Sequence, residues 1–138
     1  MTKDFHIIIV TYNRVNYLKN CIKSVLKQKK VSIYLDIIDN GSVDNTKEYL
    51  RKFRNFQNER IIINSHRIEQ NIDPLMAAVN SITNFKGNFI NFLGDDDWYN
   101  SDDVLYKIKS LFSVKSLATI MTTFKKINLN DSFKNYEF

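Results

Sequence analysis

The sequence predicts an α/β fold of three layers, α/β/α, in which a mainly parallel sheet lies between helices. Short apolar runs of strand length alternate four times with segments whose apolar residues recur at helical spacing. The chain has 138 residues, which is the size of one ordinary domain. With only 3 glycines and 1 proline it contains no flexible linker. We therefore expect a single domain over residues 1–138.

The first half of the chain predicts two strand–helix pairs. Residues 5–10 form a continuous apolar run rich in β-branched side chains, which favours a buried strand. In residues 16–28 apolar positions recur every three or four residues with lysines between them, which predicts an amphipathic helix. A second buried strand is expected over residues 33–38. A shorter helix over residues 45–53 follows, with Asp44 as its N-cap.

The second half repeats the alternation. Strands are expected over residues 61–63 and 89–93. Between them, Asp73 provides an N-cap and Pro74 the first position of a helix. The apolar stripe of that helix is expected to consist of Leu75, Ala78, Val79 and Ile82.

The last helix and strand are predicted from the remaining apolar positions. Asn100 or Ser101 is expected to cap a helix whose first turn holds Asp102 and Asp103, where the helix dipole favours acids. A fifth strand is predicted over residues 118–124.

Composition excludes several classes of protein. The 20 Lys and Arg exceed the 15 Asp and Glu, so the net charge of +5 favours anionic partners such as phosphates. The single cysteine, Cys21, excludes an internal disulfide framework and a cysteine-rich zinc site. The apolar runs are far shorter than a membrane span, and the first residues lack the pattern of a signal peptide. We expect a cytoplasmic protein.

Polar clusters follow three of the predicted strands. They lie at residues 11–14, 39–42 and 94–98, whereas residues 64–67 after the third strand are less distinctive. Parallel α/β sheets bind ligands beyond the carboxyl ends of their strands. These clusters are therefore the candidate functional residues.

The strongest of these signals is the triplet Asp95-Asp96-Asp97. Three successive carboxylates repel one another, and a hard divalent cation would relieve that repulsion. The alternative is a solvated acidic turn before a helix. The preceding buried strand and the following Trp98 favour the cation site, because they place the triplet at the ligand-binding edge.

The other clusters each allow two interpretations. Asp39 and Asn40 could hydrogen-bond a nucleobase or ribose, or could only form a tight turn. Tyr12 could stack on a base or cover the end of its strand. Arg14 could contact phosphate or be a solvated residue at the start of a helix.

Taken in order, these segments resemble the N-terminal, nucleotide-sugar-binding half of family 2 glycosyltransferases, which have the GT-A fold. The matching motifs are IIIVTYNR at 7–14, DNGSVDNT at 39–46 and GDDDWY at 94–99, with the helix at 18–28 and Asn71, Ala78 and Asn80 between them. The resemblance covers residues 5 to about 124. It implies transfer of a sugar, normally with inversion, from a UDP- or dTDP-sugar to a saccharide or lipid-linked acceptor, in the synthesis of bacterial surface polysaccharides.

The resemblance also implies roles for individual residues. Thr11 and Tyr12 would line the nucleobase pocket, and Asp39 and Asn40 would hold the base or ribose. Arg67 matches a phosphate-contacting arginine within about one position. Together with Arg14 and Asp95, these residues form the expected donor site.

The acidic triplet corresponds to the family's DxD motif. Asp96 matches the metal-binding aspartate, Asp95 is a neighbouring donor contact, and Asp97 is the second expected metal ligand. The implied cofactor is Mn²⁺ or Mg²⁺, which bridges the donor diphosphate and neutralises charge on the leaving group.

Three positions depart from the family pattern. Asn40 stands where a second aspartate is common, Gly94 replaces the first aspartate of the usual DxD, and Asp73 stands where glycine is common. In the family the general base that deprotonates the acceptor lies well beyond the DxD motif, but only 41 residues (138 − 97) follow Asp97 here. The domain is therefore expected to be short at its C-terminal end and to lack most of the acceptor-binding part, and no residue can be nominated as the base. A non-catalytic nucleotide-sugar-binding module, or a fragment without transfer activity, is therefore the alternative.

A nucleic-acid-binding domain is the remaining hypothesis, and it is disfavoured. The net positive charge suits it, but the predicted ligand edge carries Asp39 and the acidic triplet, which would repel a phosphate backbone. A dinucleotide oxidoreductase is also disfavoured because no glycine-rich fingerprint follows the first strand.

Overall fold

The computed structural model describes residues 2–114 and contains a four-stranded parallel sheet. The strands are β1 (Lys3–Thr11), β2 (Ile33–Asn40), β3 (Ile61–Ile68) and β4 (Gly87–Phe92), in the spatial order β3-β2-β1-β4. All three pairings are parallel, as expected for strands joined by crossover helices. The predicted fifth strand over residues 118–124 lies outside the described residues.

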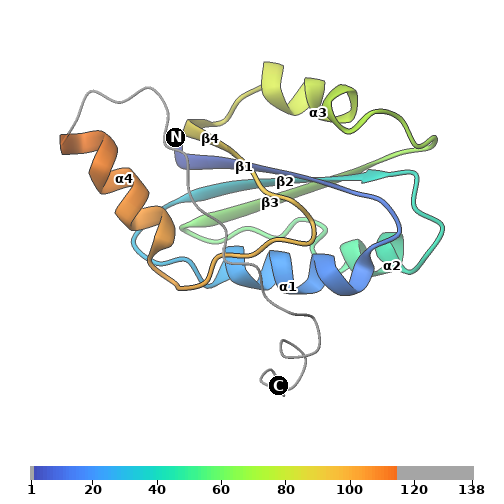
Figure 1. Ribbon diagram of the computed structural model, residues 1–138, viewed down its shortest axis with the longest axis horizontal. Coiled ribbons are helices and arrows are strands. Elements are labelled where there is room, and N and C mark those ends of the chain that lie inside the picture. Colours follow the sequence, from blue (N-terminus) through green and yellow to red (C-terminus); the bar gives the residue numbers. More distant parts are fainter. Residues whose placement is uncertain (1, 115–138) are drawn as a thin grey trace.

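Helices cover both faces of the sheet, which confirms the three-layer prediction (Figure 1). On one face lie α1 (Val15–Leu26), α2 (Thr46–Arg51) and α4 (Val104–Val114). On the other face lies α3 (Pro74–Thr83). No helix in the described part of the chain is long and apolar enough to cross a membrane.

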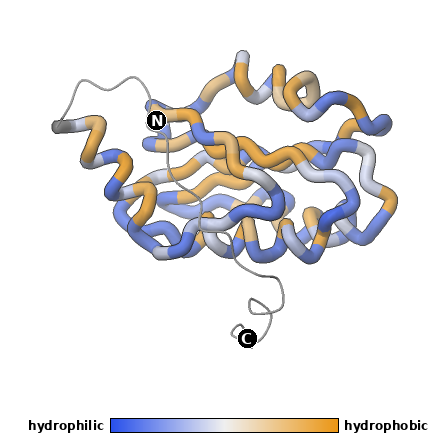
Figure 2. Tube along the Cα trace, in the orientation of Figure 1, coloured by the Kyte–Doolittle hydropathy of each residue, from blue (hydrophilic) through white to orange (hydrophobic). Residues whose placement is uncertain are grey.

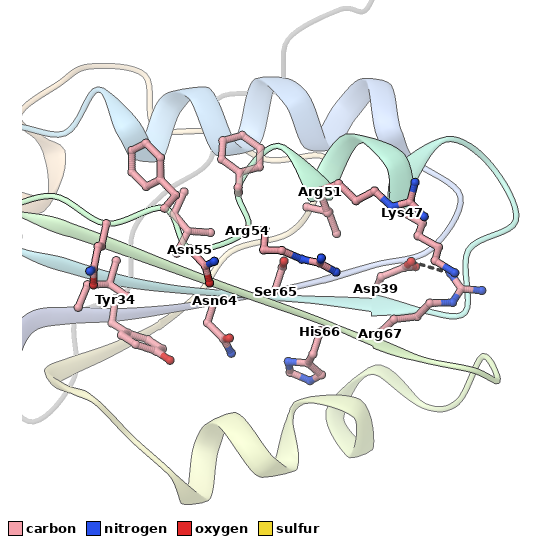
Figure 3. Close-up of a pocket in the computed structure, with 16 residues that line it drawn as sticks. Tyr34, Asp39, Lys47, Arg51, Arg54, Asn55, Asn64, Ser65, His66 and Arg67 are labelled. Atoms are coloured by element: carbon pink, nitrogen blue, oxygen red, sulfur yellow. Dashed lines mark hydrogen bonds and ion pairs between the residues drawn. The ribbon is translucent and has the colours of Figure 1, made fainter.

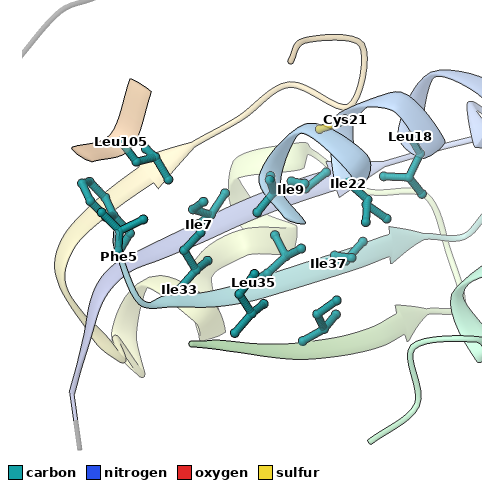
Figure 4. Packing of buried hydrophobic residues seen from close by; sticks show 14 of the residues in the cluster. Phe5, Ile7, Ile9, Leu18, Cys21, Ile22, Ile33, Leu35, Ile37 and Leu105 are labelled. Atoms are coloured by element: carbon teal, nitrogen blue, oxygen red, sulfur yellow. The ribbon is translucent and has the colours of Figure 1, made fainter. Parts of the chain in front are cut away.

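The larger core lies between the sheet and α1. Alternate residues of β1 point to opposite faces, so Phe5, Ile7 and Ile9 pack toward α1 while Ile8 packs toward α3. Leu105 of α4 joins the α1-side core (Figure 4). The hydropathy of the chain follows this layering, with apolar segments concentrated in the strands (Figure 2). The sheet is therefore fixed from both sides, and its carboxyl edge is rigidly placed.

The third strand is longer than predicted. It runs from Ile61 to Ile68 rather than over residues 61–63, so residues 64–67 are part of the strand and not a loop beyond it. The apolar pattern stops at residue 63 because Asn64 and His66 face the buried carboxylate of Asp36 on β2 and not an apolar core.

Helix α3 presents a different face from the predicted stripe. Its buried residues are Ala77, Ala78 and Ser81, whereas Leu75 and Val79 are exposed. The small side chains let the helix lie close to the sheet, and the Ser81 hydroxyl donates to Asp36 at 2.5 Å. The predicted cap is confirmed: the Asp73 carboxylate accepts from two backbone N–H groups of the first turn, and Pro74 begins the helix.

Two other helix starts differ from prediction. The N-cap of α2 is Asn45, one residue after Asp44, whose carboxylate instead accepts from Thr46 and from Val15 N. Helix α4 begins at Val104, so Asp102 and Asp103 precede its first turn. Asp102 forms an ion pair of 2.5 Å with Lys29. Asp102 therefore serves a tertiary contact, whereas Asp103 contacts its neighbours Ser101 and Lys107.

A polar cluster is buried under α3 around Asp36. The carboxylate accepts hydrogen bonds from Ser81 and Asn64, and nitrogens of His6 and His66 lie 3.8 and 3.6 Å away. Burial by itself would raise the pKa of Asp36, but these neighbours outweigh it and hold the pKa well below its usual range. The interaction with Asp36 raises the pKa of His66.

These two shifts predict a bounded pH range of greatest stability. Asp36, with a depressed pKa, stabilises the fold above about pH 4 and loses this contribution as pH falls. His66, with a raised pKa, stabilises it below about pH 6.5 and loses this contribution as pH rises through its folded pKa. Urea unfolding across pH should show the greatest free energy between these values.

The variant His66→Gln isolates the alkaline limb of this profile. As pH rises above about 6.5, the parent protein should lose at most about 1 kcal/mol of unfolding free energy through His66, because this side chain is partly exposed and its pairing is screened by water. His66→Gln should not show this decrease. An unchanged alkaline limb in His66→Gln would show that another group produces it.

Candidate functional site

The predicted site residues are assembled at the carboxyl edge of the sheet. Thr11 ends β1, Asn40 ends β2, and the acidic triplet follows β4 after a two-residue connection. Since β1 lies between β2 and β4, its end is the centre of the site. Residues 84 positions apart, Thr11 and Asp95, are in direct contact there.

Asp95 is the buried centre of a hydrogen-bonded cluster. Its carboxylate accepts from the Thr11 hydroxyl at 2.7 Å and from Arg14 Nη1 at 3.2 Å. The same guanidinium nitrogen lies 3.1 Å from Asp96 Oδ2. Arg14 and Thr11 thus neutralise and fix Asp95, while Asp96 is more than half exposed and faces solvent.

We expect Thr11→Val to lower the free energy of unfolding by about 1.5–3 kcal/mol, the usual contribution of a hydrogen bond to a charged group. The substitution keeps the shape of the side chain and removes the hydroxyl that donates to the buried Asp95. Thr11→Ser keeps the donor and should cost less. Urea unfolding of both variants measures the difference, and equal losses would show that packing of the methyl group dominates.

Asp97 differs electrostatically from its neighbours. Burial raises its pKa, and the charges of Asp96 and Asp95 raise it further. Its backbone N–H donates to Gly94 O, which closes a tight turn. A Cβ on Gly94 would approach Asp97 Oδ2 to 2.8 Å and Asp96 Oδ1 to 3.1 Å, so both carboxylates lie over this glycine.

This pair of carboxylates suits a hard divalent cation. Mg²⁺ and Mn²⁺ take oxygen ligands, commonly one or two carboxylates completed by substrate phosphates and water. Within residues 2–114 no group of three His, Cys, Asp or Glu side chains is arranged to hold a metal by itself. Asp96 and Asp97 could supply two carboxylate ligands to such a cation.

The loop that carries the acids is anchored to α1 and β4. The Cys21 thiol donates to Gly94 O at 3.3 Å, and the backbone N–H of Tyr99 donates to the Ser24 hydroxyl. The Tyr99 hydroxyl donates to Asn91 on β4. The sequence does not indicate these anchors, because only the folded chain brings α1 beside this loop.

A second charged pair lies at the ends of β2 and β3. Arg67 Nη1 donates to Asp39 Oδ2 at 2.7 Å and to Ser42 O at 2.8 Å, and Asp39 Oδ1 accepts from Ser42 N. The pairing with Asp39 raises the pKa of Arg67. The Arg67 Nε is buried and makes no hydrogen bond, and it lies 3.7 Å from Glu69 Oε2.

Asn40 and Tyr12 occupy contrasting positions. The amide of Asn40 is buried and bonds Asn71 Oδ1, Ile72 O and Ile72 N, so it holds the segment that leads into α3. A contact between Asn40 and a nucleotide stays a prediction. Tyr12 is 41% exposed, which leaves its ring accessible at the edge of the site.

Asn13 was not singled out from the sequence, yet it joins two loops of the site. Its φ of 55° turns the chain after β1, and its Oδ1 accepts from Val43 N and Asp44 N of the loop after β2. Its backbone N–H donates to Ser42 Oγ. Asparagine tolerates this left-handed backbone, which was the only available sequence signal.

Comparison with known proteins gives a consistent result. The family described as Glycosyl transferase family 2 matches residues 6–137. Over 104 residues the chain is 34% identical to glycosyltransferase GlyA of Streptococcus pneumoniae serotype 4, which covers 73% of this chain and 14% of GlyA. Over 127 residues it is 33% identical to chondroitin synthase of Pasteurella multocida, covering 91% of this chain and 13% of the synthase.

A solved structure shares the fold. Residues 1–349 of S. aureus TarS, in complex with UDP-GlcNAc, match with a TM-score of 0.70 and 21% identity, covering 80% of this chain and 31% of that one. The chain spans about one seventh of the length of the two curated relatives. The described sheet and site therefore correspond to part of larger proteins.

Proposed function

Because the chain belongs to glycosyltransferase family 2, we propose that it forms the donor-binding part of an enzyme that transfers a sugar, with inversion, from a nucleotide-diphosphate sugar to a saccharide or lipid-linked acceptor. The observation that carries the proposal is the cluster of Thr11, Arg14, Asp95 and Asp96 at the carboxyl edge of the sheet. Thr11 and Arg14 hold the buried carboxylate of Asp95, and this leaves the carboxylate of Asp96 facing solvent. That arrangement suits a phosphate–metal site.

The nucleobase and ribose are proposed to bind beside Tyr12, Asp39 and Arg67. Asp39 can accept a hydrogen bond from a base N–H if Arg67 turns toward the ligand. Tyr12 offers an exposed ring for stacking. The likeness to TarS in complex with UDP-GlcNAc supports a uridine nucleotide, with a dTDP-sugar as the second choice.

Asp96 and Asp97 are proposed to hold the divalent cation, Mn²⁺ or Mg²⁺, that GT-A glycosyltransferases generally use. When bound, the cation would neutralise the charge that develops on the leaving diphosphate. Asp95 positions Asp96 through their shared partner Arg14, and Arg14 itself is free on one side to meet phosphate. No described residue is proposed as the general base.

The acceptor is proposed to be a growing bacterial surface polysaccharide or its lipid-linked precursor. Its support is the similarity to GlyA and to chondroitin synthase, a polysaccharide-forming protein by name. Such an acceptor would place the protein inside the cell, near the inner face of the membrane.

Calorimetric titration of the chain with UDP, dTDP, GDP and CDP, each with and without Mn²⁺, tests the donor site. We expect UDP or dTDP to bind only when Mn²⁺ is present. Absence of binding by all four nucleotides would refute the donor site. If a nucleotide binds but its sugar is neither transferred nor hydrolysed, the chain is the non-catalytic module and not the enzyme.

A further inference from the structure

A groove runs along the outer edge of β3. It shares Asp39 and Arg67 with the proposed nucleobase site, but none of the acidic triplet. It has a cavity volume of about 650 Å³ and is lined by α2, by residues 53–57 and by β3 itself (Figure 3). Side chains from both faces of the sheet line it, so the groove straddles the strand edge. Its size is in the range of ordinary ligand sites.

The backbone of β3 is only partly paired on this side. Asn58 N donates to Ile61 O and Ile63 N donates to Phe56 O, so residues 56–58 cover the beginning of the strand in antiparallel fashion. Beyond them Asn55, with φ of 63°, turns the chain away. Within residues 2–114 no other segment pairs with this edge of the sheet.

The direction of the remaining backbone groups follows from that pairing. Backbone N–H and C=O groups alternate between the two sides of a strand, and those of Ile63 point outward. Those of Ser65 and Arg67 therefore also point outward, into the groove. Every second residue of this edge therefore offers an N–H donor and a C=O acceptor, to which the backbone of an extended peptide can hydrogen-bond.

The walls of the groove are positively charged. Lys47, Arg51 and Arg54 line it from α2 and the following turn, together with Arg67 of β3. Asp39 is the only acid in the lining, and it is paired with Arg67. Within the described part of the chain neither Lys47 nor Arg54 has an ion-pair partner, and Figure 3 shows Arg54 lying between α2 and Ser65.

We propose that this groove binds an acidic peptide segment, which adds as an extended strand to the free edge of β3 at Ser65 and Arg67. The partner's backbone would continue the ladder that residues 56–58 begin. Its acidic side chains would face Lys47 and Arg54, since Arg51 is already paired with Glu48. A glycan polyanion would pair with the basic side chains but would not continue the backbone hydrogen bonding of β3. The peptide is therefore the occupant that uses both features.

The test uses the whole 138-residue chain and a fluorescein-labelled peptide of alternating Glu and Val. Fluorescence anisotropy should show binding that weakens with salt, and the same peptide with Lys in place of Glu should not bind. A peptide N-methylated along one edge should bind at least about tenfold more weakly. In ¹⁵N-detected hydrogen exchange, the bound peptide should slow exchange at the Ser65 and Arg67 amides.

Two variants separate backbone pairing from charge. Ser65→Pro removes an outward N–H while leaving the pairing with β2, which edge strands tolerate. Arg54→Glu reverses a charge in the wall. Each should weaken peptide binding by about tenfold, while Lys86→Glu, at an exposed lysine beside the opposite edge of the sheet, should leave it unchanged.

Several outcomes would overturn the proposal. Equal binding of the N-methylated peptide, or unchanged exchange at Ser65 and Arg67, would mean that no strand is added. Equal binding of heparin with the same variant profile would make the groove a general polyanion surface. If Ser65→Pro fails to fold, Arg54→Glu and the N-methylated peptide still decide. Asp96 does not line the groove, so Asp96→Ala should bind the peptide normally even if it no longer binds UDP.

Discussion

Replacing Asp96 with alanine is expected to weaken UDP binding in the presence of Mn²⁺ by more than about tenfold and to abolish its dependence on the metal. Asp96 is the exposed carboxylate of the triplet, and it lies beside Asp97 over Gly94. Without it, the proposed cation keeps one protein carboxylate. Calorimetric titration with UDP, with and without Mn²⁺, measures the effect.

The same variant should remain folded. Arg14 keeps its contact with the buried Asp95, and no apolar contact is lost at Asp96. We expect its thermal unfolding, followed by circular dichroism, to match that of the parent protein. Asp103→Ala, at a carboxylate of similar exposure outside the site, is the matched control and should leave UDP binding unchanged. Retention of full Mn²⁺-dependent affinity by Asp96→Ala would exclude Asp96 as a metal ligand.

Replacing Gly87 with alanine is expected to lower the free energy of unfolding by about 3 kcal/mol, the upper part of the usual range for overpacking. A Cβ at this position would collide with His6 N and would lie 2.7 Å from Phe5 C, both backbone atoms of β1. The two strands pair directly here, with Lys3 opposite Gly87. Because backbone cannot rotate out of the way, the strands must separate.

Urea unfolding measures this loss, and Asn88→Ala is the matched control. Asn88 is the exposed neighbour of Gly87 in β4, so its truncation should change the free energy of unfolding by less than about 0.5 kcal/mol. Since β4 carries the acidic triplet, Gly87→Ala should also weaken UDP binding. A stability equal to that of Asn88→Ala would show that β1 and β4 can separate at this end without cost.

The fold could be predicted because apolar periodicity determines it. The buried faces of β1 and α1 are long and regular, and both were expected from their spacing. The prediction failed where burial is polar. Asp36 draws Asn64, His66 and Ser81 into contact, so the end of β3 and the inner face of α3 could not be inferred from apolar residues.

The candidate site was predicted as a set of residues but not as a set of contacts. The sequence placed Thr11, Arg14 and Asp95 at strand ends, and the fold brings them together. It could not indicate that Asp95 is fully engaged by the other two, which leaves Asp96 and Asp97 to face a ligand. Nor could it indicate that Arg67 pairs with Asp39, because this contact depends on the register of β3 against β2.

The single thiol of the chain, Cys21, lies sealed beneath the acidic loop and donates to Gly94 O. Burial raises the pKa of this thiol, and the charges of Asp95, Asp97 and Asp96 raise it further. A thiol in this state reacts only when the loop moves away from α1. The rate at which a thiol reagent modifies the protein therefore reports how often that loop opens. Any molecule that binds across the loop should slow the modification.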